Sequence, residues 1–300
     1  MPGGYVPLAL RPGWVLERYY GWSVVEQDRR CKILRRRTGP AVRHLILTDG
    51  LAEEGLDALA RDLRVFHPLG ITSLNDFSAP GDEPLRSVAG RRLRRVDGRR
   101  WFGVGTFVHD LAEDDATLWG RIAPRERTKC SSALRTGVRV ELADRPSEDE
   151  LRTFLELYDR MVAERNLDVL RLETLQAMAR SGCLTLARGV GADGRTLVAN
   201  VIHRSHDHGY FLFGARVADV PPGAGHLVHW EIIRKLKADG YRFYDLGLVA
   251  SRDPEDGIHR FKRSLGGTFV SSGTEFKWVS PVVAPMVKLF ERRRIADAPR

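Results

Sequence analysis

The order of periodic segments after residue 137 most constrains what this chain can fold into. Hydrophobic residues alternate in some segments, as in strands, and recur at helical spacing in others. Turn residues separate the segments, among them the short run Gly191–Gly194. An α/β (α+β) domain is therefore expected. Its elements are a strand at 138–142, helices at 147–162 and 172–180, strands at 183–190, 196–203 and 209–214, a helix at 223–238, a strand at 242–246, a helical turn, and strands at 267–270 and 274–279.

The first 115 or so residues also alternate between short strands and helices. A hairpin is predicted for Trp22–Arg36, a strand for Val42–Leu47 and a helix for Leu51–Phe66. A further strand at 71–77 and a strand entering a helix at 102–122 follow. Pro124 can occupy the first turn of another helix, which ends near Arg135.

One late stretch, Tyr241–Gly267, combines a buried strand, a polar loop and a helical turn. The strand ends in Asp245-Leu-Gly, and the turn carries Phe261 and Lys262 side by side. Open α/β sheets bind ligands beyond the carboxyl ends of their strands, where a Lys can neutralise a phosphate or a developing oxyanion. The alternative is that Asp245 caps the next turn and Lys262 is a solvated surface charge.

The run Tyr-Asp-Leu-Gly, followed by Gly-Ile-x-x-Phe-Lys-x-x-x-Gly-Gly, resembles the C-terminal signature of the FemABX family within the GNAT acyltransferase superfamily. The resemblance covers roughly Thr106–Val279. It implies two GNAT-like halves, here a reduced one at 1–115 and a complete one at 116–300. It also implies transfer of an amino acid from aminoacyl-tRNA to an amine, either on a peptidoglycan precursor or on a peptide-like natural product. Family members often have Asp-x-Gly-Gly, whereas this chain has Leu248 in place of the second glycine.

The same resemblance assigns roles to particular residues. It implies that Lys262 steadies the oxyanion formed as the amine attacks the aminoacyl ester, with Phe261 and Tyr244 beside the substrate. Asp245 could accept the proton of the amine, directly or through water. Substrate-assisted transfer without a protein base is the alternative.

A Gly-rich turn opens the helix that reaches Trp230. Gly223, Gly225 and His226 lie in this turn, and backbone N–H groups at a helix start bind anions. In GNAT enzymes this turn holds the pyrophosphate of CoA, and in FemABX proteins it lies near the 3′ end of the donor. The usual Arg/Gln-x-x-Gly-x-Gly/Ala pattern is not matched, and an ordinary loop-to-helix junction is the alternative. Arg216, after a strand end, could pair with a phosphate or carboxylate of the acceptor or be a surface residue.

The chain is basic, with a net charge of +9, which favours a polyanionic partner such as RNA. Two clusters are candidate phosphate contacts for tRNA, and the alternative for both is a solvated face. They comprise Lys32, Arg35, Arg36 and Arg37 in the predicted hairpin, and Arg125 and Lys129 in the helix after Pro124.

Other classes of protein are disfavoured by what the sequence lacks. Three scattered cysteines form no CxxC pair, and the turn with His203, His206 and His208 supplies no evident fourth ligand, so no metal site is expected. No apolar run approaches 18 residues and no signal peptide is evident, so a cytoplasmic protein without a membrane span is expected. No tightly bound cofactor is predicted, and a monomer is favoured.

Three hypotheses follow. The first is an aminoacyltransferase that uses aminoacyl-tRNA as co-substrate. The second is an N-acyltransferase of the GNAT type that uses acetyl-CoA or another acyl-CoA on a small-molecule amine. The third is a non-catalytic RNA-binding protein built on a degenerate acyltransferase fold. The Phe261-Lys262 pair favours the first.

Overall fold

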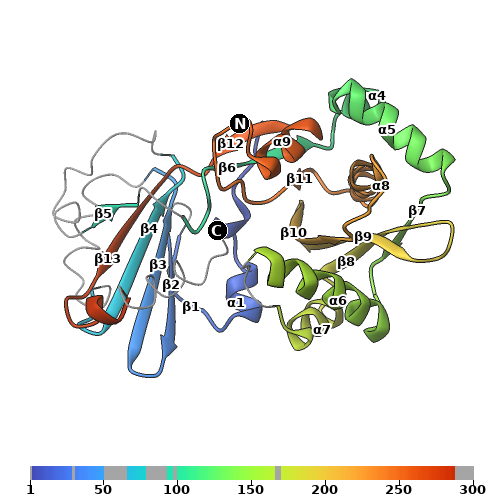
Figure 1. Ribbon diagram of the computed structural model, residues 1–300. Helices are drawn as coiled ribbons and strands as arrows, with labels where there is room; N and C mark the ends of the chain where they lie inside the picture. The colour runs from blue at the N-terminus through green and yellow to red at the C-terminus, as the bar shows by residue number, and fades with distance from the viewer. Residues whose placement is uncertain are drawn as a thin grey trace. The chain divides into compact units, whose positions relative to one another are not determined.

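The computed structural model describes residues 2–28, 31–50, 66–78, 93–96, 100–165 and 170–287 of the 300-residue chain. The chain forms two compact units (Figure 1). The larger unit comprises Met1–Tyr5 and Thr106–Val270, and the smaller unit comprises Val6–Gly105 and Ser271–Arg300.

This division differs from the expected boundary between residues 115 and 116. The strand at 105–110 pairs with the strand at 243–245, which places it in the larger unit. The last strand, 274–279, pairs with the strand at 70–76 and so belongs to the smaller unit. Sequence periodicity identified both strands, but it carries no information about partners so far away along the chain. That the smaller unit is a reduced GNAT-like half stays a prediction.

The larger unit is built on a seven-stranded mixed sheet in the order β12-β6-β11-β10-β9-β8-β7. In Figure 1, α6 and α7 lie together on one side of strands β8 to β10, and α8 lies on the other side. The elements are β6 Gly105–Asp110, α4 Asp115–Arg121, α5 Pro124–Arg135, β7 Arg139–Ala143, α6 Glu148–Arg165, α7 Leu172–Arg180, β8 Leu184–Val190, β9 Thr196–Ser205, β10 His208–Arg216, α8 Ala224–Ala238, β11 Phe243–Asp245, α9 Gly257–Ser264 and β12 Thr268–Ser271.

Local sequence signals explain several of these elements. Ser147 and Glu150 form a capping box at the start of α6, since the backbone N–H of each residue reaches the side chain of the other. Helix α8 packs closely on the sheet at Gly209, where a Cβ atom would overlap the side chain of Leu236. Because glycine lets helix and strand approach in this way, α8 and the elements that follow it are held close to β10.

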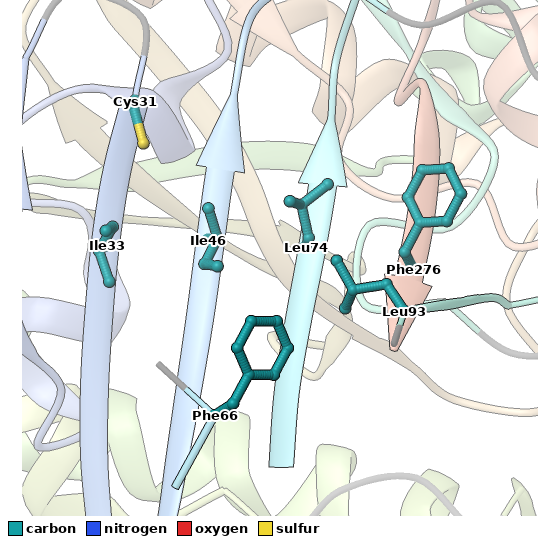
Figure 2. Packing of buried hydrophobic residues seen from close by; sticks show 7 residues of the cluster. All are labelled: Cys31, Ile33, Ile46, Phe66, Leu74, Leu93 and Phe276. Atoms are coloured by element: carbon teal, nitrogen blue, oxygen red, sulfur yellow. The ribbon is translucent and has the colours of Figure 1, made fainter. Parts of the chain in front are cut away.

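The smaller unit is built on a six-stranded sheet in the order β1-β2-β3-β4-β13-β5. Apolar side chains cover both of its faces. One face carries Ile33, Ile46, Leu74 and Phe276, which Figure 2 shows with their packing partners. The elements are η1 Leu8–Leu10, α1 Val15–Tyr19, β1 Ser23–Gln27, β2 Cys31–Thr38, β3 Ala41–Thr48, β4 Gly70–Asp76, β5 Arg94–Arg95 and β13 Thr274–Val279.

The hairpin of β1 and β2 and the strands β3 and β4 confirm the predictions for this part of the chain. The other face of the sheet carries Trp22, Leu34, Leu45 and Leu47, which pack with the N-terminal residues Ala9 and Leu10. Most of the predicted helix at 51–66 lies outside the described residues.

Candidate active site

The candidate site of the larger unit lies where two parallel strands part. Strands β10 and β11 pair only from His208 and Phe243 to Tyr210 and Asp245, and β10 then continues to Arg216 paired with β9 alone. The chain after β11 turns sharply at Gly247, whose φ is 71°. The region just beyond the carboxyl ends of parallel strands is a common place for a ligand in α/β proteins.

Asp245 occupies the end of β11 with its carboxylate buried and fully engaged. Oδ2 accepts a hydrogen bond from the hydroxyl of Tyr5 at 2.5 Å. Oδ1 accepts from Thr106 Oγ1 at 2.5 Å and from the backbone N–H of Gly247 at 2.8 Å. These donors come from three separate segments, so Asp245 fixes the chain around the end of β11. The carboxylate of Asp245 is therefore less available to accept the proton of the amine than the sequence suggested.

Lys262 projects from α9 to the same place. Its ammonium donates a hydrogen bond to the carbonyl oxygen of Leu248 at 2.7 Å and lies 5.5 Å from the ring centre of Phe211. The residue is 7% exposed. Burial lowers the pKa of Lys262 to about 8, although the nearby charge of Asp245 opposes the shift. Lys262 is therefore a buried cation at the parting of the strands, not a solvated surface charge.

An aromatic wall adjoins Lys262. The ring of Phe261 meets the rings of His226 and His229 at 4.8 and 5.6 Å between centroids. His229 Nδ1 lies 2.8 Å from the hydroxyl of Tyr244, and its ring meets that of Phe211 edge-on at 4.8 Å. Full burial holds the pKa of His229 well below its usual value, so this imidazole is neutral. The predicted residues Phe261 and Tyr244 thus lie within one cluster.

The start of α8 is largely enclosed. Gly223 has φ 90° and packs so closely on α5 that a Cβ atom would overlap the backbone of Lys129. Ala224 is fully buried, and a Cβ atom at Gly225 would lie 3.6 Å from the ring of Phe261. The start of α8 is therefore closely packed by α5 and by Phe261.

His226 links three helices at this point. Its Nε2 lies 2.8 Å from Ser264 Oγ on α9, and its Nδ1 lies 3.5 Å from the carboxylate of Glu126 on α5. Glu126 also pairs with Lys129 at 2.7 Å. Since Ser264 follows Lys262 by two residues, this chain of contacts fixes the helix that carries the buried cation.

Comparison with known proteins agrees with this geometry. Residues 123–263 match the family model described as an acetyltransferase (GNAT) domain. The chain contains a GNAT acyltransferase domain. No curated protein sequence matches the chain.

The crystal structure of FemX matches with a TM-score of 0.64 at 14% identity, over 91% of this chain and 92% of FemX. The C-terminal domain of a putative lysylphosphatidylglycerol synthetase from Agrobacterium fabrum matches with a TM-score of 0.58 at 15% identity, over 93% and 90%. L-PGS from Bacillus licheniformis matches with a TM-score of 0.59 at 12% identity, over 95% and 92%. At these identities the likeness shows the fold, and it confirms the GNAT-like architecture expected from the sequence.

Two predicted substrate residues lie elsewhere in the GNAT domain. Trp230 packs against Trp119 of α4, with ring centroids 4.8 Å apart. Arg216 is exposed at the end of β10, five residues beyond Phe211, which is about 16 Å at the usual rise of a strand. Among the predicted phosphate contacts of this unit, Arg125 is exposed, whereas Lys129 is partly buried and paired with Glu126.

The prediction that Lys32 contacts phosphate is wrong. This side chain is fully buried in the smaller unit, where its ammonium donates to the carbonyl oxygens of Arg11 and Ala9 at 2.5 and 3.3 Å and pairs with Glu17. Strand alternation turns Lys32 inward, so it neutralises a buried carboxylate. The neighbouring residues Arg35, Arg36 and Arg37 are exposed on β2, as a contact with a phosphate backbone requires.

Within the described residues, no group of three or more His, Cys, Asp or Glu side chains could hold a metal ion. Each helix in those parts of the chain is too short or too polar to span a lipid bilayer. His203 and His208 are buried in the sheet rather than gathered at one point.

Substitution of Gly223 by Ala tests the close packing of α8 on α5. A residue with a Cβ atom destabilises the folded protein by about 1–2 kcal/mol when its backbone is in the left-handed conformation. The overlap of this Cβ atom with backbone atoms adds a similar amount. We expect Gly223→Ala to lower the free energy of unfolding by about 3 kcal/mol in urea titrations. Gly257→Ala, at the open start of α9, is the control and should change it by less than about 1 kcal/mol. Equal stability of the two variants would contradict the packing described here.

Proposed function

We propose that the chain is an aminoacyltransferase that moves an amino acid from aminoacyl-tRNA to an amine. The acceptor in this proposal is a peptidoglycan precursor or a peptide-like natural product. The observation that carries it is the buried cation Lys262, placed beside Phe261 where β10 and β11 part. The Phe-Lys pair is the feature that resembles the FemABX family, and its position supports the role that the resemblance implies.

The chemistry requires one tetrahedral intermediate. The acceptor nitrogen attacks the ester carbonyl, the new C–N bond forms, and the carbonyl oxygen becomes an oxyanion. Collapse breaks the C–O bond and releases the 3′ hydroxyl of the tRNA, which takes up the proton that the amine loses. An ammonium group in a site that excludes water stabilises such an oxyanion far better than an ammonium group in water does. Lys262 supplies this charge in the proposal.

Asp245 has a positioning role in this proposal. Its two oxygens are already acceptors for Tyr5, Thr106 and Gly247, while its negative charge favours the protonated form of Lys262. Because an aminoacyl ester is already activated, transfer needs orientation and charge stabilisation more than a strong protein base. Proton transfer from the amine to the leaving hydroxyl within the substrates agrees with this arrangement.

The second candidate is transfer from acyl-CoA, and the match to an acetyltransferase (GNAT) domain favours it. A CoA pyrophosphate would need the amides at the start of α8 to be open. Gly223 packs against α5, Ala224 is buried, and a Cβ atom at Gly225 would touch the ring of Phe261, so this turn is closely packed. We therefore rank aminoacyl-tRNA above acyl-CoA as the donor.

The two donors can be separated directly. The purified protein is given a pool of amines with either charged total tRNA or acetyl-CoA, with and without RNase pretreatment. We expect labelled amino acid to leave tRNA only when both enzyme and acceptor are present, and RNase to abolish the transfer. Transfer from acetyl-CoA that RNase does not affect would replace the proposal with the second candidate.

The pH dependence of turnover tests whether Lys262 acts as a cation. The rate should first rise with pH as the acceptor amine loses its proton. It should then fall above pH 8, because Lys262, whose pKa is about 8, loses its charge. The residual activity of Lys262→Met should lack the falling limb. A wild-type rate that keeps rising beyond pH 9 would contradict the role of Lys262 as a cation.

A further inference from the structure

The smaller unit contains a cavity that the transfer chemistry does not use. Its volume is about 600 Å³, within the range of sites for small organic ligands. The floor is one face of the neighbouring strands β3, β4 and β13 (Figure 1). Trp22 and Trp101 line it, as do Val283 and Met286 from the turn after β13. These residues all belong to the smaller unit.

The floor places two cations on either side of an apolar strip. Arg43 lies on β3 and Lys277 on β13, with Ile71 and Ser73 of β4 between them. The register puts Arg43 opposite Ile71, and Lys277 opposite Ser73. From the spacing of strands and residues, the backbones of the two cations are about 12 Å apart. Two long side chains at this separation can both reach one anionic group held above the strip.

The walls are apolar and aromatic. The rings of Trp22 and Trp101 meet edge-on at 5.8 Å between centroids. Trp22 is buried, whereas Trp101 is 42% exposed and Met286 is 51% exposed. Such large apolar side chains in water, gathered at the mouth of a cavity, are typical of a ligand site. An aromatic ring or an alkyl chain would cover them.

One acidic side chain, Glu275, adjoins the lining residues Lys277 and Trp101. Glu275 precedes Lys277 on the same face of β13 and is 2% exposed. Its carboxylate accepts the backbone N–H of Trp101 at 2.6 Å and lies in the field of Arg100 and Lys277. Glu275 therefore holds Trp101 at the wall of the cavity.

We propose that this cavity binds an amphipathic organic anion, with the phosphate or carboxylate between Arg43 and Lys277 and the apolar body against Trp22 and Trp101. The inference rests on the cavity alone and does not depend on the donor used by the larger unit. The shared chemistry is an anionic head on an apolar body. A free phosphate lacks the apolar body, and a cationic amphiphile lacks the anionic head.

Isothermal titration calorimetry with decyl phosphate, kept below its micelle concentration, tests the proposal. We expect one molecule to bind per full-length chain and to change the tryptophan fluorescence. Inorganic phosphate, decyltrimethylammonium and decyl maltoside should each bind at least tenfold more weakly. Equal binding of the cationic or neutral amphiphile, binding of many molecules per chain, or no binding of decyl phosphate would overturn the proposal.

Variants locate the site. The double variant Arg43→Ala with Lys277→Ala should lower the affinity for decyl phosphate by at least tenfold, and Trp101→Ala should lower it by a similar factor. Arg35→Ala is the matched control, because Arg35 is an exposed arginine of the same sheet that does not line the cavity. A loss of affinity in the control equal to that in the double variant would show nonspecific charge attraction and would contradict the site.

Discussion

Replacement of Lys262 by Met is expected to lower kcat for amide formation by about 10²–10³-fold, the usual effect of removing one group that stabilises an oxyanion. Met keeps most of the side-chain volume, so Phe211 and Leu248 retain a neighbour while the charge is lost. Single-turnover measurements with saturating donor and acceptor isolate the chemical step. Arg263→Met, the next residue on α9, is the matched control because Arg263 is exposed, and it should keep turnover within about threefold of the wild type.

The same substitution should stabilise the protein, which distinguishes lost catalysis from lost folding. A charged Lys in a desolvated site costs free energy, and its pKa of about 8 in the folded protein lies below the usual value of 10.5. The unfolded chain therefore binds more protons between these values, so wild-type stability rises as pH increases from 8 to 10.5. At pH 7 we expect Lys262→Met to be more stable by about 2 kcal/mol, after the lost hydrogen bond to Leu248 is counted. Unchanged turnover together with raised stability would leave Lys262 without a role in transfer.

Sequence reasoning identified the segment that carries Lys262 but not its whole environment. A strand ending in Asp-Leu-Gly, followed by a Phe-Lys pair on a helical turn, was enough to predict that Asp245 and Lys262 lie near each other. It could not supply Tyr5 or Thr106, which bind Asp245 from segments about 240 and 139 residues away along the chain. No periodicity links such positions. His229 was overlooked although it follows His226 by three residues on one helix, a spacing that places both rings on the same side.

The fold shows the same contrast: the sequence locates single strands, but it does not predict how distant strands pair. Hydrophobic periodicity located β3, β4 and β13, because alternation is a property of each strand alone. Their order in one sheet, with β13 beside β4, depends on pairings across about 200 residues. The cavity that we assign to an amphipathic anion arises only from this order, since it brings Arg43 and Lys277 to the same floor. No local sequence pattern could therefore predict that cavity, because its lining residues are far apart along the chain.

Lys32 shows why a run of basic residues is a weak guide to a binding surface. Alternation along β2 sends successive side chains to opposite faces, and burial then depends on what covers each face. The N-terminal residues cover Lys32 with the carbonyl oxygens of Ala9 and Arg11 and the carboxylate of Glu17. Burial lowers the pKa of Lys32, and the pairing with Glu17 opposes that shift. The side chain is thus a structural cation, while the exposed Arg35 is the residue on which a phosphate contact can still be tested.

Truncation of Lys32 to Ala should lower the free energy of unfolding by about 4 kcal/mol, within the range for breaking one partner of a buried ion pair. Glu17 would remain, 12% exposed, with the backbone N–H groups of Gly13 and Trp14 as its donors among the described residues. The double variant Lys32→Met with Glu17→Gln removes both charges and should recover most of the loss. Urea denaturation of the three proteins at pH 7 measures these differences.

The alternative role of Lys32 predicts the opposite pattern. If its ammonium bound phosphate, the single and double variants would both weaken binding to tRNA and reduce its salt dependence, with little change in stability. Arg35→Ala provides the matched comparison, because its side chain is exposed on the same strand. We expect Arg35→Ala to alter the salt dependence without altering stability, and Lys32→Ala to do the reverse. Because burial alone separates these neighbouring cations, the pair tests whether the fold, rather than the basic composition, determines which charges are available to a partner.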